Sequence, residues 1–314
     1  MSAALAVGGF VLGVVIVIWS TEMLLDGMVG LAALLRAAPF VIAGIFSGLE
    51  AENIAVGVVA ARQGHAEIAL GTVFGGASFI VCVALGLGAV LFPMTVRLPR
   101  RVLVVAAGAP VVAGVALIGE TTSRAIGVVL LAAFAVGMWY LVRASREHDF
   151  LGAQGDEIRA EAAGPVRWWR PVTLTVVGLA VLTIGAQLVN YGADGIIRYF
   201  AFPAAVMGMI VTPAAIEAEE VIRQAVPSRE GRHDVAAGNF IGTLLYFVLF
   251  NLGLIAVAAP VRVPHRVIVL DWPFLVGATW LAIAFLSRGR LTRAQGAVLL
   301  LCYAGYITAS IVAG

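Results

Sequence analysis

Long apolar stretches recur along this chain from end to end, separated by short segments that carry most of the polar residues. A helix of about 20 apolar residues spans the hydrocarbon core of a bilayer. Ten stretches approach or exceed that length. They cover residues 8–34, 39–61, 67–92, 102–119, 123–142, 171–197, 203–224, 235–259, 267–286 and 294–312. The pattern predicts an all-α membrane protein with ten transmembrane helices.

The composition agrees with this pattern. Hydrophobic residues make up 61% of the chain and charged residues 12%, and the mean hydropathy is +1.03. Soluble globular chains are about 45–50% apolar and about 25% charged. The composition therefore excludes a soluble domain and makes the lipid bilayer one partner of the protein.

The positive charge is distributed unevenly between the loops. All 20 basic residues are arginine. Fifteen of them lie in loops that follow odd-numbered spans, with Arg223 at the end of its span counted among them. Five lie in loops that follow even-numbered spans, with Arg124 at the start of the next span counted among them. Loops rich in Lys and Arg stay on the cytoplasmic side of a membrane. We therefore expect the odd loops in the cytoplasm and both termini outside, in a bacterial-type inner membrane.

The two halves of the chain repeat each other. Residues 1–143 hold five spans, residues 144–170 form a polar cytoplasmic linker, and residues 171–314 hold the other five spans. A constant offset of 167 residues relates Glu50 to Glu217, and it also matches arginines and glycines of the two halves. Because five is an odd number, the second half must enter the membrane in the opposite direction. The chain thus predicts two inverted five-helix repeats, a plan in which secondary transporters bind substrate near the midplane.

Acids occur where a membrane helix is expected to carry none. An ionised carboxylate at the bilayer centre costs at least about 2.5–3.5 kcal/mol, so such groups need cations or protons beside them. Five glutamates lie in two short acidic phrases within predicted spans 39–61 and 203–224: Glu50, Glu52, Glu217, Glu219 and Glu220. Ion transport follows as the leading hypothesis.

Helical spacing assigns these side chains to faces. Residues three apart share a face of a helix, whereas residues two apart do not. Glu50 with Asn53, and Glu217 with Glu220, therefore form two polar faces. If the inverted halves bring these faces together, three carboxylates and one amide oxygen surround a common point. Oxygen ligands of this kind suit Na⁺, Ca²⁺, Mg²⁺ or Mn²⁺.

Further candidates lie beside these faces. Glu52 and Glu219 fall on a different face, where they widen the site, line an access path or stay protonated. Thr72, Asn239 and Thr243 lie in glycine-rich segments that follow the acidic helices, and they offer additional oxygen ligands. The alternative for the two threonines is that they only satisfy backbone groups of their own helices.

Glycine and proline precede the acids in both halves, as Gly44 and Gly48 in the first and as Gly208 and Pro213 in the second. We expect them to weaken the helices and to expose carbonyl groups as further ligands. Glycine also permits close helix packing, and both effects are compatible.

Two segments carry a family resemblance. Residues Ile68–Gly76 (IALGTVFGG) and Val235–Thr243 (VAAGNFIGT) are similar to a phrase in the α-repeats of the cation/Ca²⁺ exchanger superfamily, which includes Na⁺/Ca²⁺ and H⁺/Ca²⁺ antiporters. The resemblance covers nearly the whole chain and implies a sodium/calcium exchanger-like fold. Alignment on these segments places Asn53 and Glu220 at the position of the family's ion-binding glutamate.

The acidic motifs depart from the family pattern. Asn53 replaces one principal glutamate, while Glu50 and Glu217 stand at the family's serine position. Glu52 and Glu219 stand at its proline position. The resemblance therefore implies the fold and cation antiport, whereas the choice of ions and the coupling ratio do not carry over.

These inferences predict a secondary active cation antiporter that works by alternating access. The expected exchange is Ca²⁺ or a related divalent cation against H⁺ or Na⁺. Clustered carboxylates cannot all ionise together without a cation, so protons are expected to compete with the metal. No phosphate-cradling loop is present, so an ion gradient must supply the energy. We expect inorganic cations as substrates, no enzyme activity, no cofactor and no nucleic-acid partner.

Three alternatives remain at this point. A monovalent Na⁺/H⁺ antiporter needs fewer carboxylates, and a membrane sensor derived from an exchanger needs no transport at all. An intramembrane enzyme with glutamate metal ligands is disfavoured because the predicted spans contain no histidine. The oligomeric state is open, with a monomer as the simplest form.

Overall fold

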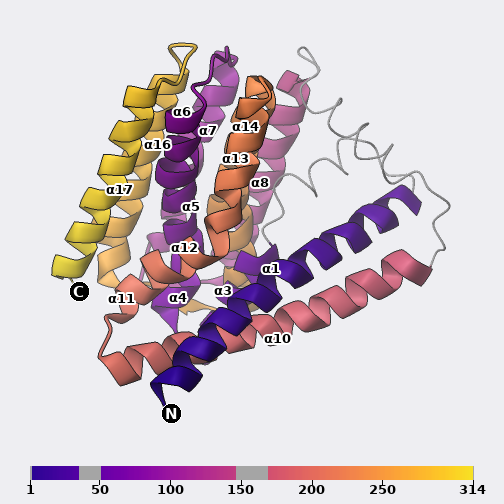
Figure 1. Ribbon diagram of the computed structural model, residues 1–314, viewed down its shortest axis with the longest axis vertical. Helices are drawn as coiled ribbons and strands as arrows, with labels where there is room; N and C mark the ends of the chain where they lie inside the picture. The colour runs from indigo at the N-terminus through magenta and orange to yellow at the C-terminus, as the bar shows by residue number, and fades with distance from the viewer. Residues whose placement is uncertain (1, 35–50, 146–168, 314) are drawn as a thin grey trace.

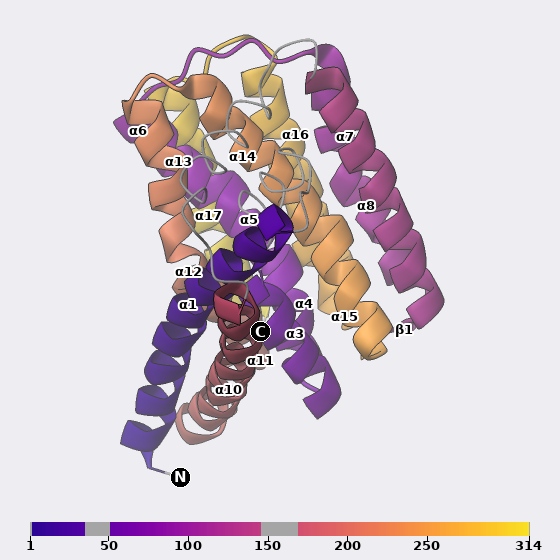
Figure 2. The ribbon, with the colours of Figure 1, turned by 90° about the vertical axis from the view of Figure 1, so that its right-hand side faces the viewer.

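The computed structural model describes residues 2–34, 51–145 and 169–313, and these residues are almost entirely helical (Figures 1 and 2). Two short strands, β1 (Thr121–Thr122) and β2 (Val261–Arg262), pair antiparallel with Thr121 opposite Arg262. They join a loop of the first half to a loop of the second.

Eight helices in the described residues are long and apolar enough to cross a membrane. Their boundaries differ from the predicted spans by five residues or fewer. They are α1 (Ala3–Leu34), the run from α4 to α6 (Ala66–Leu91), α7 with the 3₁₀ turn η3 (Arg100–Leu117), α8 (Arg124–Ser145), α10 (Trp169–Phe200), the run from α14 to α15 (His233–Ala258), η7 with α16 (Val267–Leu286) and α17 (Arg293–Ala313).

The two other predicted spans are the acidic ones. Helix α3 (Ala51–Gln63) is the described part of the first, and Gly44 and Gly48 lie outside the described residues. The second is a helical run whose turn type changes repeatedly. It comprises α11 (Ala204–Val206), the π-helical turn η4 (Met207–Val211), α12 (Thr212–Ile216), the 3₁₀ turn η5 (Glu217–Glu219) and α13 (Glu220–Arg229). Gly208 and Pro213 lie in the irregular part, as predicted.

The core consists of two runs that correspond in the two halves. The run from α4 to α6 is 94% buried and the run from α14 to α15 is 78% buried, whereas the other spans are 17–44% buried. Both core runs contain wide π-helical turns, which are frequent at functional sites. Their segments are α4 (Ala66–Leu70), η1 (Gly71–Gly75), α5 (Gly76–Phe79), η2 (Ile80–Ala84), α6 (Leu85–Leu91), α14 (His233–Leu245), η6 (Tyr246–Asn251) and α15 (Leu252–Ala258).

Helices α1 and α10 pack against each other along much of their length and cross the bundle obliquely (Figures 1 and 2). A Cβ on Gly13 would lie 2.6 Å from the backbone nitrogen of Val189, and a Cβ on Gly27 would lie 2.5 Å from that of Thr175. Only glycine allows such contact between helix backbones. The contacts run in opposite directions along the two helices, so α1 and α10 are antiparallel.

The loops sort to the two ends of the molecule. The connections from α6 to α7, from α13 to α14 and from α16 to α17 lie together at the top of Figure 1, and both chain ends lie toward the bottom. These three loops follow the third, seventh and ninth predicted spans. The arginine-rich loops among the described residues therefore share one end.

Candidate functional site

Elements of both halves place buried polar side chains inside the bundle. The start of α3 carries Glu52 and Asn53, which are 2% and 0% exposed. Turn η5 and the start of α13 carry Glu217 and Glu220, which are 1% and 2% exposed. The predicted site residue Glu50 lies outside the described residues.

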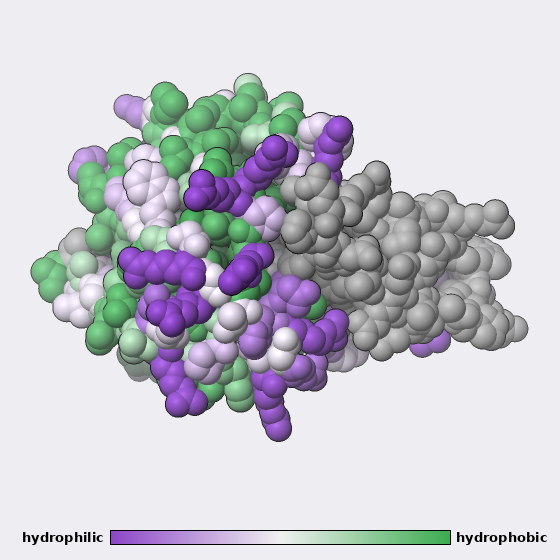
Figure 3. Space-filling model, turned by 90° about the horizontal axis from the view of Figure 1, so that it is seen from above, coloured by the Kyte–Doolittle hydropathy of each residue, from purple (hydrophilic) through white to green (hydrophobic). Residues whose placement is uncertain are grey.

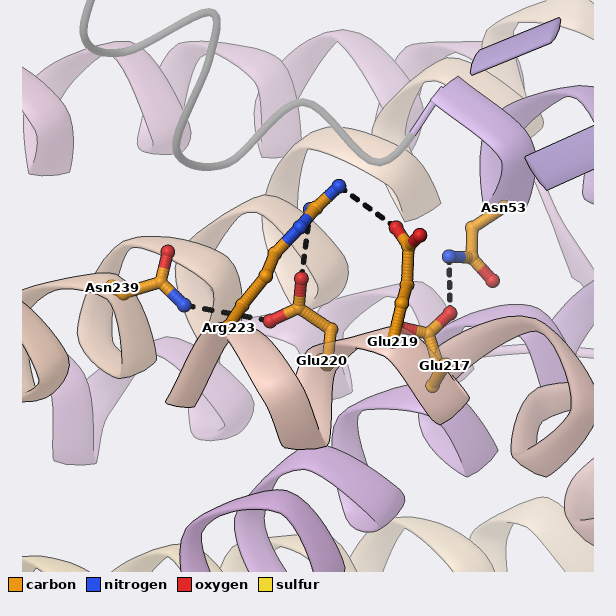
Figure 4. A network of polar contacts seen from close by, with 6 residues as sticks. All are labelled: Asn53, Glu217, Glu219, Glu220, Arg223 and Asn239. Carbon is orange, nitrogen blue, oxygen red and sulfur yellow. Dashed lines mark hydrogen bonds and ion pairs between the residues drawn. The ribbon is translucent and has the colours of Figure 1, made fainter. Parts of the chain in front are cut away.

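Asn53 and Glu217 join the two halves directly. Asn53 Nδ2 donates a hydrogen bond of 2.5 Å to Glu217 Oε1 (Figure 4). Among the described residues, Glu217 Oε2, Asn53 Oδ1 and Glu52 Oε2 have no hydrogen-bond partner. Buried oxygen atoms without a partner are rare in folded proteins and require an explanation such as an ion. These three atoms are the strongest ligand candidates that the structure offers.

Glu52 belongs to this cluster. Its carboxyl group lies near those of Glu217, Glu219 and Glu220. Helical spacing places Glu52 on a different face from the Glu50 and Asn53 pair, but α3 is packed by α10, α4 and α15. Because neighbours lie on several sides of α3, more than one of its faces is buried.

Arg223 forms ion pairs with both Glu219 and Glu220 and offsets one of their two negative charges. Its Nη1 lies 2.8 Å from Glu220 Oε1, and its Nη2 lies 2.8 Å from Glu219 Oε1 (Figure 4). Asn239 Nδ2 donates a hydrogen bond of 3.4 Å to Glu220 Oε2. Figure 4 shows Glu220 directed toward Arg223 and Asn239, while Glu217 is directed toward Asn53. The guanidinium group of Arg223 therefore provides the positive charge beside Glu220 that a bound cation would otherwise provide.

This arrangement is not a closed metal site. Among residues 2–34, 51–145 and 169–313, no three His, Cys, Asp or Glu side chains are grouped so that they could hold a metal ion. The carboxylates of Glu217 and Glu220 have different partners. Convergence of Glu50, Glu217 and Glu220 on one point stays a prediction, and it requires Glu220 to leave Arg223.

The threonine candidates are both fully buried. Thr72 Oγ1 donates a hydrogen bond of 2.9 Å to Ala69 O of its own helix. The same oxygen lies 2.7 Å from the position that a Cβ on Gly57 of α3 would take. Thr72 thus satisfies a backbone group while its oxygen faces the acidic helix, and its lone pairs remain available.

Two polar residues of the site were not found by reasoning on the sequence. Arg223 follows Glu219 and Glu220 by four and three residues, so helical spacing alone could have paired it with both. Asn190 of α10 donates a hydrogen bond of 3.2 Å to Val56 O of α3. An amide within a long apolar stretch was the available signal for Asn190.

Comparison with known proteins identifies the fold and the family. A family model described as "Sodium/calcium exchanger protein" matches residues 5–143 and 171–312. A candidate antiporter of Alkalimonas amylolytica, CaxA, is 26% identical over 308 residues, which are 94% of this chain and 95% of the relative.

Two solved structures share the fold. The H⁺/Ca²⁺ exchanger CAX superposes with a TM-score of 0.72 at 12% identity, covering 98% of this chain and 86% of CAX. The sodium-calcium exchanger NCX_Mj superposes with a TM-score of 0.61 at 21% identity, covering 98% of this chain and 99% of NCX_Mj. The predicted resemblance to the cation/Ca²⁺ exchanger superfamily is confirmed. This chain belongs to the sodium/calcium exchanger family, whose members are cation antiporters of the membrane and not enzymes.

Proposed function

We propose that this protein exchanges Ca²⁺ or a related divalent cation for H⁺ or Na⁺ by alternating access at a carboxylate site near the midplane of the membrane. One observation carries the proposal. The Asn53–Glu217 contact links the two halves in a buried place, and the oxygen atoms Asn53 Oδ1, Glu217 Oε2 and Glu52 Oε2 have no partner there among the described residues. Hard oxygen ligands of this type suit Ca²⁺, Mg²⁺ and Na⁺.

The proposal includes ten spans in two inverted repeats, residues 1–143 and 171–314, joined by the linker 144–170. The antiparallel packing of α1 on α10 supports the inversion. So does a pair of glycine contacts. Gly86 of α6 packs on Gly296 of α17, and Gly253 of α15, which is 167 residues after Gly86, packs on Gly127 of α8.

Inverted symmetry extends the site to Glu50. The offset of 167 relates Glu217 to Glu50 and Asn53 to Glu220. If the symmetry extends to this pair, the counterpart of the Asn53–Glu217 contact would be a contact between Glu50 and Glu220. Two carboxylates in contact require a proton or a cation between them. Protons and metal ions would then compete for the carboxylates of Glu50 and Glu220.

In the observed arrangement, Arg223 provides the positive charge beside Glu219 and Glu220. An entering cation must displace its guanidinium from Glu219 and Glu220, and the guanidinium returns when the cation leaves. The guanidinium therefore offsets part of the negative charge of the site when no substrate is bound, which lowers the cost of burying its acids. Thr72, Asn239 and Thr243 would complete the coordination of the cation.

A monovalent Na⁺/H⁺ antiporter is the second candidate. Asn53 removes one negative charge from the ligand set, and Arg223 balances another. A site with fewer free charges favours a cation with a single charge. A divalent-cation exchanger is expected to carry labelled Ca²⁺ across the membrane, whereas a monovalent exchanger is expected to carry labelled Na⁺ and not Ca²⁺.

Flux into proteoliposomes tests both candidates. Purified protein is reconstituted, and uptake of labelled Ca²⁺ and of labelled Na⁺ is measured with an outward gradient of H⁺ or of Na⁺ and without one. We expect gradient-driven Ca²⁺ uptake, which Glu217→Gln impairs strongly. Because protons occupy the same oxygens as the metal, the apparent affinity for Ca²⁺ should weaken as the pH falls. Uptake of Na⁺ alone would identify the monovalent exchanger, and binding of Ca²⁺ without flux in either assay would favour a sensor.

A further inference from the structure

A basic pocket lies at the end of the molecule that carries the arginine-rich loops. Figure 3 looks onto this end, where many hydrophilic side chains gather. The pocket has a volume of about 470 Å³ and lies between the segment before α7 and the segment after α16. Arg97, Arg100 and Arg288 line it together with Ser287, and none of its lining residues is acidic.

Backbone pairing holds the two segments together. Met94 N donates to Leu291 O at 3.0 Å, and Leu291 N donates to Met94 O at 2.8 Å. Val96 N also donates to Gly289 O at 3.1 Å, and Gly289 has a φ of 76°, which only glycine adopts without strain. Arg97 and Arg288 therefore project from segments that are fixed to each other, and Arg100 projects from the start of α7.

The charge of this pocket is unbalanced. Within the described part of the chain, no ion pair joins Arg97, Arg100 or Arg288 to an acid. Arg100 also lies in the first turn of α7, which has no side-chain cap. The positive end of the helix dipole lies at this turn. Three arginine side chains near the start of a helix therefore favour the binding of an anion in this pocket.

An apolar groove continues from the pocket along the outer surface of the bundle. It has a volume of about 400 Å³, runs between α7 and α16, and shares Arg100, Leu103 and Ser287 with the pocket. Val104 on its wall is 69% exposed, as expected for a surface that faces lipid. Trp280 Nε1 donates a hydrogen bond of 3.1 Å to Ala107 O, which fixes the indole ring beside the groove.

We propose that the pocket and the groove together bind one anionic phospholipid. The phosphate lies against Arg97, Arg100 and Arg288, because guanidinium groups match phosphate oxygens in charge and geometry. One acyl chain lies in the apolar groove between α7 and α16. A soluble phosphate would use only the pocket, and a neutral lipid would use only the groove. Since α7 belongs to the first half and α16 to the second, the bound lipid contacts both halves and holds them together.

The test uses the full-length protein in a mild neutral detergent. Retention of added lipid is measured by native mass spectrometry, and the melting temperature is measured in parallel. The probes are dioleoyl phosphatidylglycerol, dioleoyl phosphatidylcholine and inorganic phosphate. We expect phosphatidylglycerol to be retained and to raise the melting temperature. Phosphatidylcholine and millimolar phosphate should do neither.

Matched variants separate the pocket from general surface charge. The triple variant Arg97→Gln/Arg100→Gln/Arg288→Gln should bind phosphatidylglycerol about tenfold more weakly or worse. The control Arg101→Gln/Arg290→Gln/Arg293→Gln removes the same charge from the same two connections and the adjoining helix ends, outside the residues that line the pocket. It should keep the affinity of the parent protein.

A third variant tests the groove. Ala284→Phe fills the groove and leaves the arginines in place, so it should weaken phosphatidylglycerol binding without reducing the melting temperature of the lipid-free protein. Equal loss in the two arginine triples would overturn the proposal, as would undiminished binding to Ala284→Phe. Stabilisation by inorganic phosphate equal to that by the lipid would identify an anion site and also overturn it.

Discussion

The charge balance of the site depends on one arginine. Arg223 contacts both Glu219 and Glu220, and its side chain is 32% exposed, so water reaches its outer part. A buried acid without a partner is costly, and a paired acid is tolerated. Arg223 can therefore serve as a built-in substitute for the transported cation, one turn away from the acids that it neutralises.

Removing this substitute should strengthen cation binding. Arg223→Gln frees Glu220 from a competing guanidinium. A hydrogen bond to a charged group is worth about 1.5 kcal/mol, so apparent cation affinity should rise about tenfold. Turnover should fall, because the empty site then holds unbalanced acids. Isothermal titration and flux measure the two effects, and Arg229→Gln on the exposed end of α13 is the matched control. Weaker cation binding in Arg223→Gln would contradict the substitute role.

The acids should differ in importance. Glu220→Gln is expected to reduce flux to background, because it removes the acid at the family's ligand position. Glu50→Gln and Glu217→Gln should also impair flux strongly, and Glu219→Gln should be milder because Glu219 is partly exposed and paired with Arg223. Size-exclusion profiles and melting temperatures establish that each variant folds. A folded Glu220→Gln variant with the flux of the parent protein would show that Glu220 is not a ligand.

Glu52 and Arg223 show which parts of the site could be predicted from the sequence. Spacing on a regular helix pairs residues along one helix, as it pairs Asn53 with Glu50, but the contact of Asn53 with Glu217 joins two helices and depends on how the halves pack. The burial of Glu52 depends likewise on the helices that surround α3, which lie far away in the sequence. Arg223 was assigned to the arginine-rich loop after its span, and the continuation of α13 to Arg229 places it inside the helix.

At the scale of elements, glycine lets the two halves touch through their backbones. A Cβ on Gly71 of η1 would clash with Gly208 O of η4, and a Cβ on Gly208 would clash with Glu67 O. This contact lies directly before the acidic turn of the second half. Span positions could be predicted because apolar length alone determines them. The π-helical and 3₁₀ turns could not, because tertiary packing decides where a helix widens.

Substitution at this crossing should cost stability. Gly208→Ala places a methyl group against the backbone of α4, and overpacking of this kind typically costs about 1–3 kcal/mol. The melting temperature in detergent should fall, and flux should fall with it because η4 leads into the acids. Gly277→Ala in α16 is the matched control, since a Cβ there would meet no atom within 4 Å. If both variants melt at the same temperature, the close contact does not stabilise the fold.

At the scale of the whole molecule, the distribution of arginine and the arrangement of the helices agree. The loops after the third, seventh and ninth spans lie at one end of the bundle (Figure 1). The β1–β2 pair lies toward the other end with both termini, as the label of β1 in Figure 2 shows. If the protein has ten spans, the chain crosses the membrane an even number of times, and both termini lie on the same side. Under the positive-inside rule, we expect the arginine-rich end to face the cytoplasm.

Labelling of single cysteines tests this orientation. In a background with Cys82→Ala and Cys302→Ala, single cysteines are introduced as Arg101→Cys and Arg290→Cys at the arginine-rich end and as Arg124→Cys and Arg262→Cys at the opposite end. All four arginines are exposed. A membrane-impermeant maleimide added to intact cells should label positions 124 and 262, whereas positions 101 and 290 should react only after permeabilisation. The reverse pattern would mean that the termini are in the cytoplasm. Labelling of positions 101 and 124 from the same side would contradict the crossing of the membrane by α7 and η3, because that helix is the only connection between them.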